Sequence, residues 1–359
     1  MLRAGPRVGK RYRPNILEFV ATTDGGRETV NMISRIVLIG ALMSFFHPVL
    51  AANAQSLLKI RVGSPAPSAV VAPIWIPQEA GIYAKYGLDT EIIFFNSGGL
   101  SLRTLIAGEV PITMSGGSDI IPAVLSGGPV FLISSYAERI PLTLVTSPAI
   151  KSVNQLRNKK LAISRFGSNT DVAMRYLISK AGMDPTKDVT FVQVGGQSAR
   201  FAALKNGSVD ATVIGPPSTL IARKLNLNLL VNLAASDLEF LYAGIATTKS
   251  YLSARPDVVE RYLKAFVEGV HFAKTNKEKT IKYMSKHLKG AAEELEESYN
   301  EMILKVIKVD PTISESATRA VLEQVADRMP EAKNAKPGDF VNTAVIDKLK
   351  SEKFLARLR

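Results

Sequence analysis

Two short segments rich in glycine and hydroxyl side chains stand where an apolar run ends and a helix-forming stretch begins. The first comprises residues 115–119 and contains Ser118, and the second comprises residues 165–171 and contains Thr170. Free N–H groups at the start of a helix, with hydroxyls beside them, bind carboxylates, sulfonates and similar anions. Each hydroxyl is alternatively a helix cap, but the two segments together favour an anion site.

Five other residues are candidates for the same site. Arg165 either pairs directly with an anion or is a solvated charge. Trp75, the only tryptophan, is either a pocket wall or part of the core. Tyr242 is a hinge or a pocket residue. Gly116 and Gly215 end two short strands, where a missing side chain permits either a close backbone contact or the approach of a ligand.

The sequence contains little that supports catalysis or metal binding. The absence of cysteine excludes disulfides, thiol catalysis and thiolate metal sites. His271 and His287 are sixteen residues apart, which is not a metal-ligand spacing. No phosphate loop, G-x-G-x-x-G fingerprint or G-x-S-x-G elbow is present. We therefore predict that the protein is not an enzyme and has no cofactor and no metal.

Residues 1–54 have the features of a leader that is removed. Arg35 precedes an apolar run over 36–46, and Ala52 and Ala54 supply the small residues that precede cleavage, here before Gln55. The run is shorter than the about 20 residues of a membrane-spanning helix, which favours cleavage over a membrane anchor. Residues 1–31 are either an extended leader or residues that are not translated, because the true start codon is that of Met32. We predict a periplasmic protein, secreted through this signal peptide.

Composition indicates a folded, two-domain protein. The chain has 359 residues, 46% hydrophobic and 21% charged, which is ordinary for globular proteins and long enough for two cores. The formal charge of +13 falls to +9 without residues 1–54. Basic and acidic residues alternate along 255–286, without a stripe of aromatic and basic residues, so we predict no nucleic acid partner.

The positions of the candidate segments follow from an α/β pattern that occurs twice. Short apolar strands over 58–62, 90–95 and 111–114 alternate with amphipathic stretches, which indicates a largely parallel sheet. A Gly-Gly-x-Ser-x-Arg motif at 98–103 recurs at 195–200, and each copy leads into a helix that ends in glycine and then into a short strand. The repeat predicts two lobes of one plan. We place the first lobe at 55–146 plus 245–359 and the second at 147–244.

Four segments carry a resemblance to a known family. In their order and spacing, residues 81–89, 105–111, 156–164 and 207–211 resemble the transporter solute-binding proteins of the nitrate, sulfonate, taurine and thiamine-pyrimidine group. The resemblance implies the type II periplasmic binding protein fold, with two α/β lobes and a ligand cleft between them. The family's binding positions fall here on Ser64, Pro65, Gly117, Ser118, Ser135, Gly167, Ser168, Asn169, Thr170, Gly215 and Pro216.

The same resemblance implies a function and its partners. It indicates a monomeric protein that captures a small organic anion and delivers it to an ABC permease with its ATPase, contacting the membrane only through the permease. Two alternatives use the same fold: binding or synthesis of the thiamine pyrimidine precursor, and a ligand sensor for a membrane receptor. Fungal relatives that make the pyrimidine use a histidine and a cysteine-rich stretch, and this chain has no cysteine.

Overall fold

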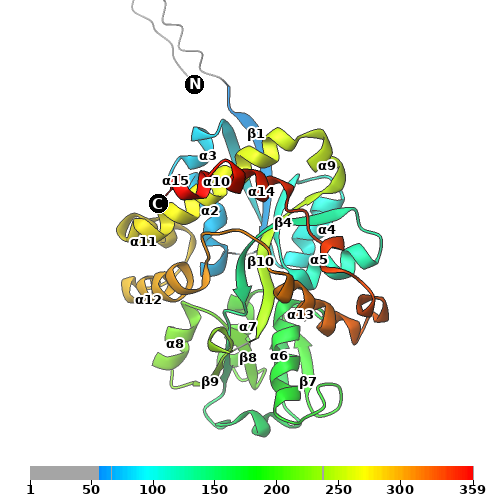
Figure 1. The fold of residues 1–359 in the computed structure, drawn as a ribbon. Helices are drawn as coiled ribbons and strands as arrows, with labels where there is room; N and C mark the ends of the chain where they lie inside the picture. The colour runs from blue at the N-terminus through cyan, green and yellow to red at the C-terminus, as the bar shows by residue number, and fades with distance from the viewer. Residues whose placement is uncertain (1–55, 66, 237, 359) are drawn as a thin grey trace, which may run out of the picture. The chain divides into compact units, whose positions relative to one another are not determined.

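Two five-stranded sheets organise the chain (Figure 1). The structure is a computed structural model that describes residues 56–65, 67–236 and 238–358. Sheet A, ordered β2-β1-β3-β10-β4, consists of β1 (Leu58–Pro65), β2 (Leu88–Phe95), β3 (Ile112–Ser115), β4 (Val130–Arg139) and β10 (Glu239–Thr248). Sheet B, ordered β7-β6-β8-β5-β9, consists of β5 (Thr143–Thr146), β6 (Lys160–Ile163), β7 (Thr190–Gln193), β8 (Ala211–Ile214) and β9 (Asn228–Asn232).

The two sheets have one plan, as the repeated motif predicts. In sheet A, β1 is parallel to β2 and β3, and β10 is antiparallel to β3 and β4. In sheet B, β6 is parallel to β7 and β8, and β5 is antiparallel to β8 and β9. Gly108 and Gly207, which follow the two motif helices, have positive φ angles of 79° and 75°. The predicted helix-ending role of these glycines is therefore confirmed.

The chain passes between the sheets twice, after β4 and after β9. Residues 143–146 pair in sheet B although we placed them in the first lobe, and residues 239–244 belong to β10 of sheet A although we placed them in the second. Apolar runs at both crossings look alike in sequence, so they do not show which sheet each run joins. The lobe division itself stays a prediction.

Helices lie against both sheets (Figure 1). Those that lead from strand ends are α4 (Gly98–Ile106), α5 (Gly117–Leu125), α6 (Asn169–Lys180), α7 (Gln197–Lys205) and α8 (Ser218–Lys224). The others are α2 (Ala72–Glu79), α3 (Ile82–Lys85), α9 (Lys249–Ala254), α10 (Pro256–Thr275), α11 (Lys277–His287), α12 (Ala292–Ser298), α13 (Glu315–Ala326), α14 (Ala344–Ser351) and α15 (Phe354–Arg357). Short 3₁₀ turns are η1 (Ala69–Val71), η2 (Val153–Leu156), η3 (Leu233–Ala235), η5 (Pro330–Lys333) and η6 (Pro337–Asp339), and η4 (Tyr299–Val306) is a π-helix.

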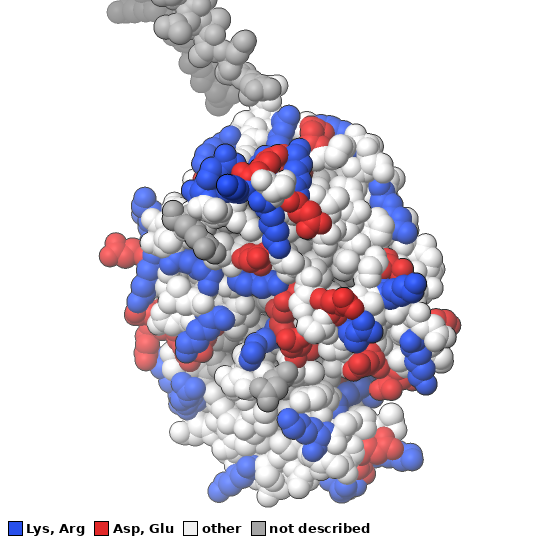
Figure 2. Space-filling view, viewed as in Figure 1, with Lys and Arg blue, Asp and Glu red and all other residues white. Residues whose placement is uncertain are grey.

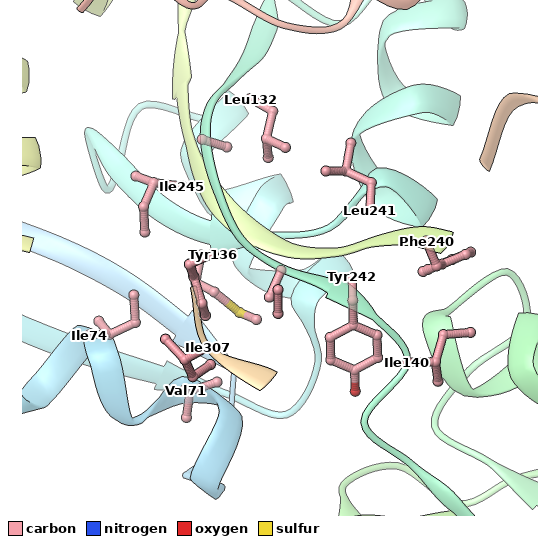
Figure 3. Close-up of a cluster of buried hydrophobic side chains, with 14 of the residues drawn as sticks. Val71, Ile74, Leu132, Tyr136, Ile140, Phe240, Leu241, Tyr242, Ile245 and Ile307 are labelled. Atoms are coloured by element: carbon pink, nitrogen blue, oxygen red, sulfur yellow. The ribbon is translucent and has the colours of Figure 1, made fainter. Parts of the chain in front are cut away.

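The antiparallel pair β4 and β10 passes through a buried apolar cluster (Figure 3). Tyr136, Phe240 and Ile245 are fully buried there, and Leu241 is nearly so. Full burial of one such side chain stabilises a fold by about 1.5–3 kcal/mol. Packing in this cluster therefore fixes the two strands of sheet A that connect to the second sheet.

The sequence predicts one apolar face on a long helix from the helical spacing of its apolar residues, and a solvated helix face over 293–297. The first prediction is confirmed, and the second fails at Glu294. In α10, the predicted positions Val259, Tyr262, Leu263, Phe266, Val267 and Val270 are all buried. The acidic run 293–297 was expected to be solvated, but Glu294 is only 9% exposed. Its Oε2 accepts a hydrogen bond from the Ala291 N–H at 2.9 Å, so this carboxylate caps the start of α12.

The surface carries mixed charge. On the face shown in Figure 2, lysines and arginines are interspersed with acidic side chains. Within the described residues, the structure contains no helix that combines the length and apolar character needed to cross a membrane. The predicted signal peptide and its cleavage site lie outside the described residues.

A polar cluster joins the end of α2 to the end of α11. The Glu79 carboxylate accepts a hydrogen bond from Lys286 Nζ at 2.5 Å and lies 2.9 Å from His287 Nε2. The ring of His287 stacks on Trp75, with ring centroids 4.4 Å apart. Burial raises the pKa of Glu79, but the hydrogen bonds and charges of Lys286 and His287 outweigh it and lower that pKa below its ordinary value of 4.5.

We predict that Glu79→Gln destabilises the protein at neutral pH but not in acid. A carboxyl group whose pKa is lowered by folding stabilises the fold above its unfolded-state pKa, and the effect disappears as pH falls through the folded-state pKa. For a partly exposed pair we expect about 1 kcal/mol at most, or about 2 °C in Tm, at pH 7. Thermal unfolding of Glu79→Gln between pH 3 and 7 measures this, with the exposed Glu109→Gln as control. A deficit that persists at pH 3 contradicts the prediction.

Candidate functional site

A cavity of about 460 Å³, the cleft, lies where strand ends of both sheets face each other. Sheet A contributes Pro65 at the end of β1 and residues 114–116 at the end of β3. Sheet B contributes residues after β6 and, after β8, Gly215 and Pro216. The carboxyl ends of strands are where open α/β sheets present a ligand crevice. The cleft therefore occupies the position that the Gly/Ser segments predict.

Four helices begin at the cleft. The residues that precede α4, α5, α6 and α7, which are Ser97, Gly116, Ser168 and Gly196, all line it. Ser97 caps α4 and Ser168 caps α6 by accepting main-chain hydrogen bonds. Gly196 has no side chain that caps α7, so N–H groups at this start remain available to a ligand. Each helix start favours an anion by about 0.3–1 kcal/mol, so convergence of several starts matters.

The α7 start also brings a buried arginine to the cleft. Arg200 is only 3% exposed, and it donates hydrogen bonds from Nη1 to the Gly195 carbonyl at 2.6 Å and from Nη2 to the Val213 carbonyl at 3.2 Å. Its Nε has no hydrogen-bond partner, and none of the described carboxylates forms an ion pair with it. Burial lowers the pKa of Arg200 to about 10, so the guanidinium stays charged at neutral pH.

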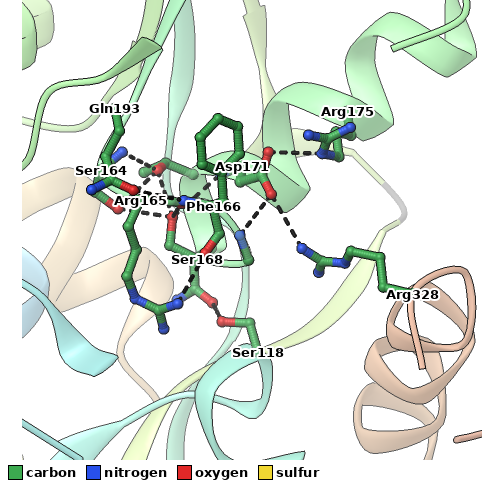
Figure 4. Close-up of polar contacts among 12 residues, drawn as sticks. Ser118, Ser164, Arg165, Phe166, Ser168, Asp171, Arg175, Gln193 and Arg328 are labelled. Atoms are coloured by element: carbon green, nitrogen blue, oxygen red, sulfur yellow. Dashed lines mark hydrogen bonds and ion pairs between the residues drawn. The ribbon is translucent and has the colours of Figure 1, made fainter. Parts of the chain in front are cut away.

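A second arginine at the cleft does have a carboxylate partner. Arg165, in the loop after β6, forms an ion pair with Asp119 of α5, and both residues line the cleft. Beside this pair, Ser118 donates a hydrogen bond to Asn169 Oδ1, while Asn169 Nδ2 donates to the Tyr242 carbonyl at 3.0 Å. These contacts join elements of sheet A to the loop and helix that follow β6 in sheet B. Figure 4 shows the contact made by Ser118.

The loop before α6 is held together by its own hydroxyls. Thr170 Oγ1 accepts a hydrogen bond from the Ser164 N–H at 2.8 Å, and Ser164 Oγ donates to Ser168 Oγ at 2.8 Å. Ser168 is therefore the helix cap, while Thr170 closes the loop onto the end of β6. All three residues line the cleft. The helix-cap role considered for Thr170 is wrong, because Ser168 holds it, and the binding role of these hydroxyls stays a prediction.

The structure brings nine of the predicted site residues to the cleft and leaves six away from it. The nine are Pro65, Gly116, Arg165, Ser168, Asn169, Thr170, Gly215, Pro216 and Tyr242. The residues that do not line the cleft are Ser64, Trp75, Gly117, Ser118, Ser135 and Gly167.

Those six have other surroundings, and one of them, Gly117, is buried at the start of α5. Ser64 and Ser135 are fully buried in strands of sheet A, and Trp75 is buried against His287. Ser118 and Gly167 line a neighbouring cavity. A single residue step along a strand or helix turns the side chain to another side, and a motif position cannot resolve that step.

Sequence reasoning missed several polar residues of the cleft. Arg200, Gln197 and the glycine pairs 98–99 and 195–196 line it, and Ser115 Oγ is buried beside it without a hydrogen-bond partner. Gln197 exchanges two hydrogen bonds with the main chain of Gly215, at 3.0 and 3.1 Å. The signal was present, because the repeated Gly-Gly-x-Ser-x-Arg motif contains most of these residues, but we used it only to infer the two lobes.

Gly116 is required by a close backbone contact. A Cβ atom at Gly116 would lie 2.3 Å from the Tyr242 carbonyl oxygen of β10, and one at Gly215 would lie 2.9 Å from the Pro141 carbonyl oxygen. Of the two reasons considered for these glycines, the structure supports the close backbone contact. Both also line the cleft, so their role in binding stays a prediction.

We predict that Gly116→Ala destabilises the protein by about 1–3 kcal/mol, because the new methyl group must displace the β10 main chain. The expected loss in Tm is a few degrees. Gly338→Ala is the matched control, since a Cβ at Gly338 meets no atom within 4 Å. Thermal unfolding of both variants measures the difference, and equal midpoints would refute the close contact.

Comparison with known proteins identifies the family. The chain belongs to the NMT1/THI5-like family, whose model matches residues 68–280. A relative from Bacillus subtilis, YtlA, named as a binding protein, is 20% identical over 331 residues, which cover 88% of this chain and 97% of YtlA.

Solved structures establish the fold. A protein of Bordetella bronchiseptica RB50 matches with a TM-score of 0.72 and 16% identity, covering 83% of this chain and 98% of that one. The alkanesulfonate-binding protein SsuA from Xanthomonas axonopodis pv. citri, bound to MOPS, matches with a TM-score of 0.66 and 16% identity, covering 76% and 93%. The predicted α/β fold of the type II periplasmic binding proteins is thus confirmed. The desulfurization enzyme DSZB has the same fold, with a TM-score of 0.61, 12% identity and coverage of 83% and 100%.

Proposed function

We propose that this protein is a periplasmic solute-binding protein that captures a small organic anion in the cleft and delivers it to an ABC permease. The observation that carries the proposal is Arg200, a buried guanidinium at the cleft with no carboxylate partner among the described residues. A buried charge without a counter-ion is costly, and a bound anion relieves that cost. The start of α7, which has no side-chain cap, adds main-chain donors beside it.

The size and walls of the cleft favour an anion with an organic part. Its volume of about 460 Å³ is far more than an inorganic ion of a few atoms fills. Apolar side chains form much of its wall, among them Val71, Met114, Leu142, Val194 and Met302. An organic anion could place its carboxylate or sulfonate beside Arg200 and the start of α7 and pack its apolar part against this wall. Such a ligand would suit both the polar and the apolar lining of the cleft.

Binding is favoured over catalysis by the side chains available. None of the described residues that line the cleft is a histidine, lysine or glutamate, and Asp119 is engaged by Arg165. A nucleophile with an adjacent base is therefore missing from this part of the chain. DSZB is an enzyme with the same fold, and fold alone does not fix function. An enzymatic role is therefore the alternative to binding.

Similar proteins support the binding role. SsuA, whose fold this chain shares, is an alkanesulfonate-binding protein, and YtlA is named as a binding protein. In the proposed cycle the ligand stabilises the arrangement in which both sheets contact it, and the permease recognises that arrangement. A monomer with a cleaved leader fits this role.

We predict that small organic anions raise Tm and that blocking the cleft abolishes the effect. A ligand at 100 times its Kd stabilises the folded state by about 2.7 kcal/mol, which corresponds to several degrees. The panel comprises alkanesulfonates and carboxylates of increasing chain length, nitrate, bicarbonate and the thiamine pyrimidine. Nitrate and bicarbonate should give smaller shifts than the best organic anion.

Two tryptophan variants on α7 supply the test and its control. Ala199 is exposed and lines the cleft, so Ala199→Trp should occupy it and remove the shift. Ala202 is exposed on the same helix without lining the cleft, so Ala202→Trp should retain the shift. The proposal is wrong if no member of the panel shifts the wild-type protein, or if Ala199→Trp responds as fully as Ala202→Trp.

A further inference from the structure

A second cavity, of about 330 Å³, adjoins the cleft and is lined by three arginines; we call it the arginine pocket. Arg103 comes from α4, Arg165 from the loop after β6, and Arg328 from the segment after α13. The pocket shares Asp119 and Arg165 with the cleft, so their ion pair stands between the two cavities. The proposed function does not use this space.

The charges on the pocket are unbalanced. Asp119, the single acidic side chain among its described lining residues, is engaged by Arg165. Arg328 Nη1 lies 3.3 Å from Asp171 Oδ2, but that carboxylate also accepts hydrogen bonds from Arg175 Nε and from the Gly167 N–H (Figure 4). None of the described carboxylates forms an ion pair with Arg103. The lining therefore has an excess of positive charge.

The three guanidinium groups lie close enough to repel one another. Burial lowers the pKa of Arg165, and the charges of Arg103 and Arg328 lower it further. Arg165 Nε is buried without a hydrogen-bond partner. A cluster of cations with an unused buried donor favours an anion, because the anion relieves the repulsion and completes the hydrogen bonding.

The floor of the pocket strengthens this preference. Leu102 and Val325 are buried beneath it, and Pro122, Ala123 and Met329 are half-buried at its sides. Apolar walls lower the local dielectric constant, so the attraction between an anion and the arginines is stronger here than on an open surface. Arg103 and Arg328 are themselves exposed, which leaves the pocket accessible from solvent.

We propose that the arginine pocket is a second anion site, which takes a tetrahedral dianion such as sulfate or hydrogen phosphate, free or as the end group of a small molecule. A planar guanidinium group presents paired N–H donors that match two oxygens of such an anion. A dianion matches the excess charge of three arginines over one aspartate. The bound anion would contact α4 and the segment after α13 on one side and the loop after β6 on the other, so it would join elements of both sheets.

Equilibrium dialysis with [³⁵S]sulfate, and in a second arm with [³²P]phosphate, tests the proposal at constant ionic strength set by chloride. All measurements use the Ala199→Trp background, so that an anion in the cleft is not counted and failure of the proposed function does not affect the result. Arg103→Gln and Arg328→Gln should each weaken binding at least tenfold. Arg319→Gln is the charge-matched control, because Arg319 is exposed on α13, pairs with Glu315 and does not line the pocket.

The expected result is one bound dianion per chain in the background protein and in the Arg319→Gln control. Saturation with either sulfate or phosphate supports the site. Weaker binding of an ester such as methyl phosphate than of phosphate would indicate that the site takes a free anion. The proposal is overturned if neither anion binds, or if both arginine variants bind as tightly as the control. Thermal unfolding of each variant confirms that it is folded under the dialysis conditions.

Discussion

The guanidinium of Arg200 is the constraint around which the cleft is organised. It is held by the carbonyls of Gly195 and Val213, so its position depends both on the turn before α7 and on β8. Two main-chain carbonyls orient the group but do not neutralise it. The folded protein thus keeps a positive charge at the boundary between its interior and the cleft, and the anion of the proposed function would lower the energy of that charge.

The repeated sheet plan explains why such a site forms between two sheets. In each sheet the parallel strands end in glycine-rich turns that lead into helices, so the starts of α4, α5, α6 and α7 all meet the same cavity. The motif that carries Arg200 in sheet B carries Arg103 in sheet A. Arg200 faces the cleft, whereas Arg103 faces the arginine pocket, so one repeated pattern supplies a cation to each of two adjoining cavities.

Sequence predicted the architecture better than the contacts. Periodicity and the repeated motif predicted the two α/β units and the buried face of α10, because those features depend on local patterns. The position of Arg200 at the cleft was missed, since it depends on β8 lying beside α7. Of the two hydroxyl residues predicted for the site, Thr170 lines the cleft and Ser118 does not. Their hydrogen bonds with Asn169 Oδ1 and with the Ser164 N–H depend on a residue distant in sequence and on the path of the loop, which local patterns do not define. Ser135 does not line the cleft, because a family position alone does not fix side-chain direction, and Trp75 lies in the core, which is one of the two roles considered for it.

The most direct test of the account compares an organic anion with an uncharged molecule of the same shape. Isothermal titration of the wild-type protein with the tightest-binding alkanesulfonate or carboxylate of the panel, and with the matching methyl sulfone or amide, isolates the contribution of charge. A buried arginine with unoccupied main-chain donors beside it predicts that the anion binds at least tenfold more tightly, a difference of about 1.4 kcal/mol or more. Equal affinities for the two, or tighter binding of the uncharged molecule, would contradict the claim that the cleft selects anions.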